Sequence, residues 1–136
     1  MFLQFLFMIS ISSFALAASP LKSEEEKLSR KIVEVMKKQD AAGIKSLLHS
    51  KCPPHEDKIK SITSKAWTDR YQVRIKKLEE TFDMKKTGFV AVPEYVMEFQ
   101  VWQKTTPERE LVKFFIVARE NGEPKLLEWP CYEVKP

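Results

Sequence analysis

The sequence predicts an α+β domain in which N-terminal helices pack on a curved antiparallel β-sheet. Apolar residues recur at helical spacing between residues 23 and 67, and from about residue 70 they alternate with polar residues as in half-buried strands. The pair Asn121-Gly122 is typical of a β-hairpin turn. With 136 residues, 43% of them apolar, the chain fits a single folded domain and is neither disordered nor collagen-like.

Residues 1–18 have the layout of a secretory signal peptide, which leaves residues 19–136 as the single domain. The first 17 residues carry no charged side chain, and Ala15 and Ala17 provide the small residues of a cleavage site. The apolar run is short for a membrane span. Because no Lys or Arg precedes it, an uncleaved anchor remains an alternative, and only then would a membrane be a partner. We therefore expect a protein exported to the periplasm or the extracellular space.

Export decides how the two cysteines are interpreted. Cys52 and Cys131 lie 79 positions apart, and in an oxidising compartment the simplest expectation is an internal disulfide. In the chain-entropy treatment, a loop of that length stabilises a fold by about 4.5 kcal/mol. A zinc site is not expected, because these cysteines and the two histidines, His49 and His55, lack the paired short spacing of metal ligands. We expect no bound metal and no cofactor.

Three helices are expected in the first half of the domain. Ser23, with Glu26 three positions later, has the spacing of a capping box for the first helix. Asp40 is expected to be the N-cap of the second helix, and the proline pair at 53 and 54 is expected to end it. A third, short helical segment is predicted between His55 and Trp67.

The second half of the chain predicts a meander of antiparallel strands. Apolar residues alternate at positions 71, 73 and 75, and again at 95, 97, 99 and 101. From Leu111 to Ala118 every residue except Lys113 is apolar, so this strand is expected to be covered on both faces. The N-terminal helices can cover one face. The other face requires either a curved sheet that encloses a pocket or a second subunit.

The order of these elements is similar to that of the nuclear transport factor 2-like superfamily. The similarity extends over residues 24–132 and includes a short second helix that begins Asp40-Ala41-Ala42-Gly43 and a terminal hairpin over residues 114–127. The resemblance implies a cone-shaped half-barrel with a cavity between sheet and helices, and dimers through the sheet. That superfamily contains enzymes and non-catalytic domains, so the resemblance selects no function by itself. The cystatin-like fold is a structural neighbour, but Gln72-Val73-Arg74-Ile75 lacks its inhibitory Q-x-V-x-G pattern.

We expect no catalytic residues. Pocket enzymes of the superfamily transfer protons with a His-Asp pair or with Tyr and Asp, and the best candidates for such roles here are His55, Asp57 and Tyr95. His55 follows two prolines in an exposed loop or helix start, and His49 lies near a helix end. Both histidines are therefore interpreted as surface or capping residues. The sequence contains no nucleophile motif and no nucleotide-binding fingerprint.

A basic stretch over residues 58–77 contains seven lysines and arginines and a single acidic residue. Arg70, Arg74 and Lys76 fall on one face of the predicted strand, where they would attract an anionic partner. The alternative is a solvated face that is basic by chance.

Two tryptophans complete the set of predicted ligand-binding residues. Amphipathic rings favour pocket mouths and interfaces, and on this ground Trp102 and Trp129 are expected to contact a ligand. The alternative is that these rings belong to the core, as large residues that alternate on a strand more often do.

Together these features predict an exported, non-catalytic binding or interaction module that uses a cone cavity or an open sheet face. Its partner is expected to be a protein or a small apolar or anionic ligand, with a homodimer through the sheet as one arrangement; nucleic acid is not expected. Two alternatives remain: a small pocket enzyme of the isomerase or dehydratase type, and a secreted inhibitor that acts through residues 58–77.

Overall fold

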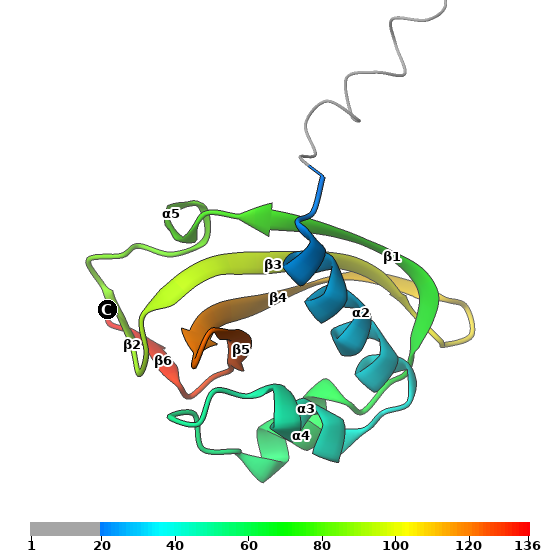
Figure 1. Cartoon of the computed structure of the whole chain (residues 1–136). Helices are drawn as coiled ribbons and strands as arrows, with labels where there is room; N and C mark the ends of the chain where they lie inside the picture. Colours follow the sequence, from blue (N-terminus) through cyan, green and yellow to red (C-terminus); the bar gives the residue numbers. More distant parts are fainter. Residues whose placement is uncertain (1–19) are drawn as a thin grey trace, which may run out of the picture.

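The computed structural model describes residues 20–136, so the predicted signal peptide lies outside the described part. The predicted α+β class is confirmed, since helices pack against an antiparallel sheet (Figure 1). In chain order the elements are α2 (Ser23–Lys37), α3 (Ala41–Leu47), α4 (Glu56–Ile62), β1 (Trp67–Lys76), α5 (Leu78–Thr81), β2 (Thr87–Phe89), β3 (Pro93–Gln103), β4 (Arg109–Glu120), β5 (Glu123–Leu127) and β6 (Tyr132–Val134).

The main sheet has four antiparallel strands in the order β1-β3-β4-β5. Its register places Val73 of β1 beside Phe99 of β3, and Phe99 beside Lys113 of β4. The short strands β2 and β6 pair separately as an antiparallel ribbon. Strands β3, β4 and β5 are neighbours both along the chain and in the sheet, as expected for a meander joined by short turns.

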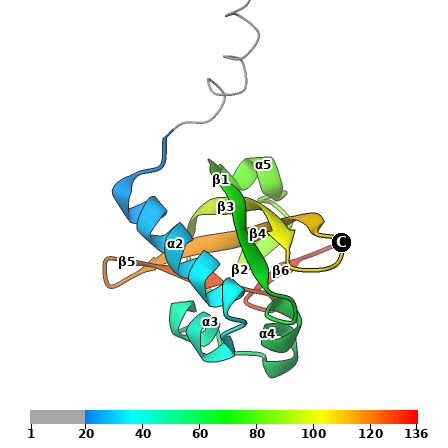
Figure 2. The ribbon, with the colours of Figure 1, turned by 90° about the vertical axis from the view of Figure 1, so that its right-hand side faces the viewer.

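The sheet curves, and helices α2, α3 and α4 lie inside the curve (Figure 1). Helix α2 runs across the sheet, while α3 and α4 close the lower side of the arch. After a turn of 90°, β1 is seen as an edge strand beside α2 (Figure 2). Helix α2 buries Leu28, Ile32 and Met36, which share one face at helical spacing.

Three large aromatic side chains fill the centre of the curved sheet. Trp67 from the start of β1, Phe99 from β3 and Phe115 from β4 are each at most 2% exposed. The ring centroids lie 5.5 Å apart for Trp67 and Phe99, 5.5 Å for Phe99 and Phe115, and 6.4 Å for Trp67 and Phe115. These tilted and edge-on contacts are the geometries that aromatic rings prefer. Side chains therefore occupy the centre of the space in which a cone cavity was expected.

Strand β4 departs from the prediction that residues 111–118 are covered on both faces. Residues 115–118 are all buried within the single chain, so this half of the strand needs no second subunit. In the other half, Val112 is 51% exposed and Phe114 is 44% exposed. Side chains alternate along a strand, so these two lie on the face opposite to the buried Phe115. The helices cover the inner face alone at this position.

The helix starts agree with the prediction in one case and differ from it in the other. Asp40 is the N-cap of α3, and its carboxylate accepts a hydrogen bond of 2.9 Å from the Gly43 amide. Ser23 is not the N-cap of α2, because the helix already includes it. Lys22 is the N-cap, and its amide donates to Glu25 Oε1 at 2.9 Å. The predicted capping interaction therefore exists one residue earlier.

Two helix ends also differ from the prediction. Helix α3 ends at Leu47, before the proline pair, because Leu48 leaves the helix to form a β-bridge with Leu126. Helix α4 ends at Ile62, and Trp67 opens β1 instead of closing a helical segment. Helix α5 has no counterpart in the prediction.

The predicted disulfide is confirmed: Cys52 is bonded to Cys131, with their Cα atoms 5.3 Å apart. Both residues are buried. Close by, the His49 amide donates to the Leu126 carbonyl at 2.9 Å. The disulfide and this backbone bond hold the segment between α3 and α4 against the C-terminal part of the sheet.

We expect reduction of the disulfide to lower the free energy of unfolding by about 2–5 kcal/mol, because the bond restrains a long loop of the unfolded chain. Urea denaturation followed by circular dichroism, with and without reductant, measures the effect. The double variant Cys52→Ala/Cys131→Ala is the control and should not respond to reductant. A wild-type midpoint that reductant leaves unchanged would contradict the expectation.

Candidate interaction surface

The outer face of the main sheet is built by three strands whose side chains alternate with the buried core. Because Phe99 and Phe115 point inward, the residues next to them along each strand point outward. We call this surface the open face. It comprises Arg70, Gln72, Arg74 and Lys76 of β1, Glu98, Gln100 and Trp102 of β3, and Glu110, Val112 and Phe114 of β4.

Cationic side chains lie over the aromatic rings of the open face. The Arg70 guanidinium is 4.3 Å from the centroid of the Trp102 ring, and Lys76 Nζ is 5.9 Å from that of the Phe114 ring. Contacts of this kind contribute about 0.5–1 kcal/mol at exposed sites. Phe114 nevertheless remains 44% exposed. The open face thus presents apolar surface that is flanked by cations.

These cations are themselves paired with carboxylates. Arg74 Nε lies 2.5 Å from Glu98 Oε1, Lys76 Nζ lies 3.3 Å from Glu98 Oε2, and Arg70 Nη1 lies 3.2 Å from Glu108 Oε2. Burial tends to raise the pKa of Glu98, but the hydrogen bonds from Arg74 and Lys76 outweigh it and hold that pKa below its ordinary value. The open face therefore carries charges of both signs.

All of the predicted ligand-binding residues except Trp129 lie on the open face. Trp129 follows β5 and is 51% exposed. Its ring meets that of His55 edge-on, with 6.3 Å between the centroids. The basic stretch is divided between α4, the loop after it and β1, so its cations belong to separate elements.

The three catalytic candidates lie in two places. His55 is the N-cap of α4, where its Nδ1 accepts a hydrogen bond of 3.4 Å from the Lys58 amide, and Asp57 lies in the first turn of that helix. Tyr95 lies at the start of β3, in a cleft whose lining contains neither of the other two. The capping role expected for His55 is confirmed.

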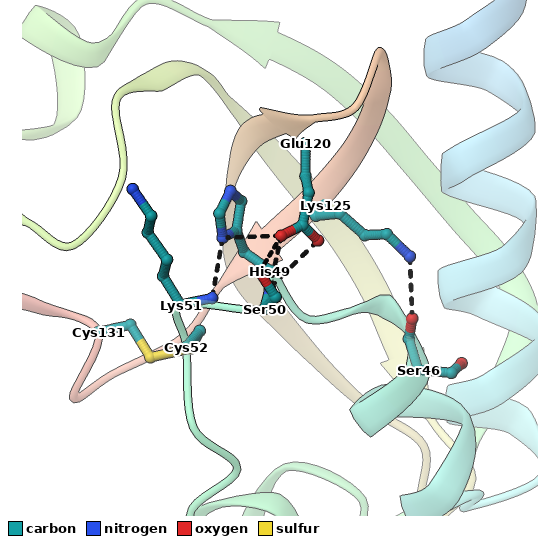
Figure 3. A network of polar contacts seen from close by, with 8 residues as sticks. All are labelled: Ser46, His49, Ser50, Lys51, Cys52, Glu120, Lys125 and Cys131. Atoms are coloured by element: carbon teal, nitrogen blue, oxygen red, sulfur yellow. Dashed lines mark hydrogen bonds and ion pairs between the residues drawn. A yellow bond between two sulfur atoms is a disulfide. The ribbon is translucent and has the colours of Figure 1, made fainter.

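A polar network joins the segment after α3 to the β4–β5 hairpin (Figure 3). Glu120 accepts hydrogen bonds from the Ser50 hydroxyl and, at 3.2 Å, from the Ser50 amide. The hydroxyl bond above all holds the pKa of Glu120 below its ordinary value, against the opposing effect of desolvation. Lys125 Nζ adds a hydrogen bond of 3.2 Å to the Ser46 carbonyl. The network fastens the chain after α3 to the sheet.

Although it contains serine, histidine and glutamate, this network is not a catalytic triad. The Ser50 hydroxyl donates to Glu120, whereas a nucleophilic serine needs an imidazole as its base. His49 Nδ1 accepts the Lys51 amide at 3.1 Å, and its distance of 3.7 Å to Glu120 Oε2 exceeds that of a hydrogen bond. His49 is only 5% exposed, so it is not the expected surface residue. The β-bridge between Leu48 and Leu126 places the neighbouring His49 against the sheet, where its side chain is buried.

Glu128 is a titratable residue that sequence reasoning missed. It follows β5, and its carbonyl accepts the Cys131 amide at 2.7 Å. Burial raises the pKa of its carboxyl to about 7, against the opposing effect of Lys58 and Lys113. The one available signal is a glutamate that directly follows two core leucines. Such a perturbed pKa occurs at functional sites and also where a structural turn is buried.

Comparisons with known proteins do not place the chain: no family profile, no curated protein and no solved structure matches it. The similarity to the nuclear transport factor 2-like superfamily therefore stays a prediction. Within residues 20–136, no helix has the length and apolar character needed to cross a membrane. The same residues contain no group of His, Cys, Asp and Glu side chains placed to hold a metal ion. The disulfide is compatible with an exported protein.

We expect Glu128→Gln to stabilise the protein above neutral pH. The native pKa of about 7 lies above the ordinary value of 4.5, so ionisation of the wild-type carboxyl lowers the free energy of unfolding as the pH rises from 4.5 to about 7. The glutamine side chain has nearly the same shape as that of glutamate but carries no charge. The variant's free energy of unfolding should exceed that of the wild type by about 1–3 kcal/mol at pH 8 and equal it near pH 4. Urea unfolding at both pH values measures this, and a difference independent of pH would contradict it.

Proposed function

We propose that the protein is an exported binding module that contacts a protein partner through the open face of its sheet. The observation that carries this proposal is the exposure of Val112 and Phe114 on the outer face of β4. Trp102 is the diagonal neighbour of Val112 across β3 and β4. Apolar side chains that gather on one surface, rimmed by polar ones, are typical of interaction sites.

The filled interior favours binding at the surface over chemistry in a pocket. A catalytic pocket needs ionisable side chains that converge on an apolar cavity. Here Trp67, Phe99 and Phe115 occupy the centre of the curved sheet. His55 caps the N-terminus of α4, and Asp57 lies in the first turn of that helix. The pocket-enzyme alternative is therefore the weaker proposal.

The charges of the open face favour a partner with low net charge where it makes contact. Arg74 and Lys76 share Glu98, and Arg70 pairs with Glu108, so the attraction for an anion is reduced. This pairing also weakens the alternative of an inhibitor that acts through residues 58–77. A second copy of the chain meets the same condition, because the cations of its own open face are paired with carboxylates as well. A homodimer through the sheet is thus one form of the proposed interaction.

The proposal is tested by placing a photo-cross-linking amino acid at Val112 in cells that export the chain. We expect a covalent adduct with one protein species, because this position lies within the proposed contact surface. Val92 is the matched control, since it is also a valine, is 85% exposed and lies outside the open face. Adduct formation at Val112 should exceed that at Val92 by about tenfold, as expected for a buried contact against a solvent-exposed position.

Light scattering of the purified mature protein identifies the partner if it is a second copy. A mass of twice the chain, returned to that of one chain by Phe114→Glu, would assign the open face to a homodimer. An adduct of the same size and yield from Val112 and Val92 would contradict the proposal. So would the lack of any adduct at Val112.

A further inference from the structure

An open cleft of about 680 Å³ lies at the end of the sheet where β1 finishes. It is bounded by the first turn of α2, the end of β1, helix α5 and the start of β3. The first three of these parts lie in the upper half of Figure 1. We call it the β1 cleft. Its volume is within the range of about 300–1,000 Å³ that is typical of ligand sites. The lining includes Glu25, Ile75, Lys76, Lys77, Leu78 and Tyr95.

Tyr95 contributes an unused hydrogen-bond donor to this cleft. Its hydroxyl oxygen is buried and has no hydrogen-bond partner within residues 20–136. Leaving a buried hydroxyl unpaired costs about 1–3 kcal/mol, a cost that phenylalanine would avoid. Burial first, and then the charge of Glu25 and neighbouring glutamates, raise the pKa of Tyr95 to about 12. The hydroxyl therefore stays protonated at neutral pH and can donate a hydrogen bond to a ligand.

Glu25 contributes unused acceptor capacity. It is 9% exposed, and the one hydrogen bond that its carboxylate accepts within residues 20–136 comes from the Lys22 amide at 2.9 Å. Glu94, which also lines the cleft, is instead paired with Arg119 at 2.9 Å. A carboxylate has about four acceptor positions, so Glu25 can hold a further cationic donor.

The end of β1 contributes the opposite charge. Lys77 lines the cleft and makes no ion pair within residues 20–136, whereas Lys76 shares Glu98 with Arg74. The charges of the complete lining balance. It contains Lys22, Arg74, Lys76 and Lys77 and also Glu25, Glu79, Glu80 and Glu94. Such a lining favours a ligand that carries both charges over a simple anion or cation.

We propose that the β1 cleft binds a short zwitterionic peptide, with its ammonium group on Glu25 and its carboxylate on Lys77. The Tyr95 hydroxyl donates to a peptide carbonyl between these two ends, once a side chain at the rim shifts to expose it. Charge-assisted hydrogen bonds at both ends orient the ligand. A peptide of about two to four residues suits the volume of the cleft. This site does not use the aromatic residues of the open face and does not depend on the function proposed above.

The test compares tri-alanine with two blocked forms, N-acetyl-tri-alanine and tri-alanine amide, using the mature chain and proton–nitrogen correlation NMR. We expect tri-alanine to shift the signals of the cleft residues saturably. Each blocked form should bind about tenfold more weakly, because it lacks one charge-assisted contact. Equal binding of the three peptides, or no saturable shift with tri-alanine, would overturn the proposal.

Matched variants assign the contacts. Glu25→Gln removes the charge while keeping an acceptor for the Lys22 amide, since Gln also serves at this position of a capping box. Tyr95→Phe removes only the hydroxyl and should be at least as stable as the wild type. These variants and Lys77→Ala should each weaken tri-alanine binding about 5–10-fold. Lys85→Ala, which changes an exposed lysine outside the cleft, should have no effect.

Wild-type affinity in both Glu25→Gln and Lys77→Ala would overturn the proposed binding mode. These results are independent of the Val112 cross-linking experiment, because neither Glu25 nor Lys77 belongs to the open face. The peptide site and the protein-binding surface can therefore fail separately.

Discussion

The contact among Trp67, Phe99 and Phe115 is the constraint on which the rest of the structure depends. Each ring comes from a different strand, so the three together fix β1, β3 and β4 in one curve. Buried aromatic residues of this kind typically stabilise a domain by about 3–5 kcal/mol each relative to alanine. Because these rings occupy the centre of the curve, the binding sites proposed above lie on the outer sheet face and in a cleft at the end of β1.

The same packing determines the character of the open face. Burial of Phe99 and Phe115 fixes the register of β3 and β4, since a slip of one residue would turn the core side chains outward. Glu98, Val112 and Phe114 are consequently held in fixed rows on the outer face. The ion pairs of Glu98 with Arg74 and Lys76 further restrain those side chains. A surface ordered in advance loses less conformational freedom when a partner binds.

The sequence predicts well where local interactions decide the outcome. The Asp40 cap acts within one turn, and the alternation in β1 and β3 reflects one buried face. The disulfide is expected from two cysteines in a chain predicted to be exported. The sequence fails as a guide where distant residues decide. Helix α3 ends because Leu48 forms a β-bridge with Leu126. Val112 and Phe114 in the first half of β4 are exposed because no element within residues 20–136 covers the outer face there. Neither the placement of Tyr95 and Glu25 in the lining of the β1 cleft nor the burial of Glu128 has a spacing that a single sequence reveals.

The side chains whose types suggest catalysis lie apart from the two surfaces proposed for binding. Ser50, His49 and Glu120 have the composition of a hydrolytic site, yet their hydrogen bonds fasten the chain after α3 to the β4–β5 hairpin. The nearby Cys52–Cys131 disulfide fastens the same segment to the C-terminal part of the chain. These contacts therefore have a structural role, which is to hold α3 and α4 against the core. Exposed Val112 and Phe114 on the open face, and the unpartnered Tyr95 hydroxyl in the β1 cleft, are among the unsatisfied groups within residues 20–136. Since saturated hydrogen-bonding groups have little left to offer a ligand, we place both proposed binding sites on those two surfaces.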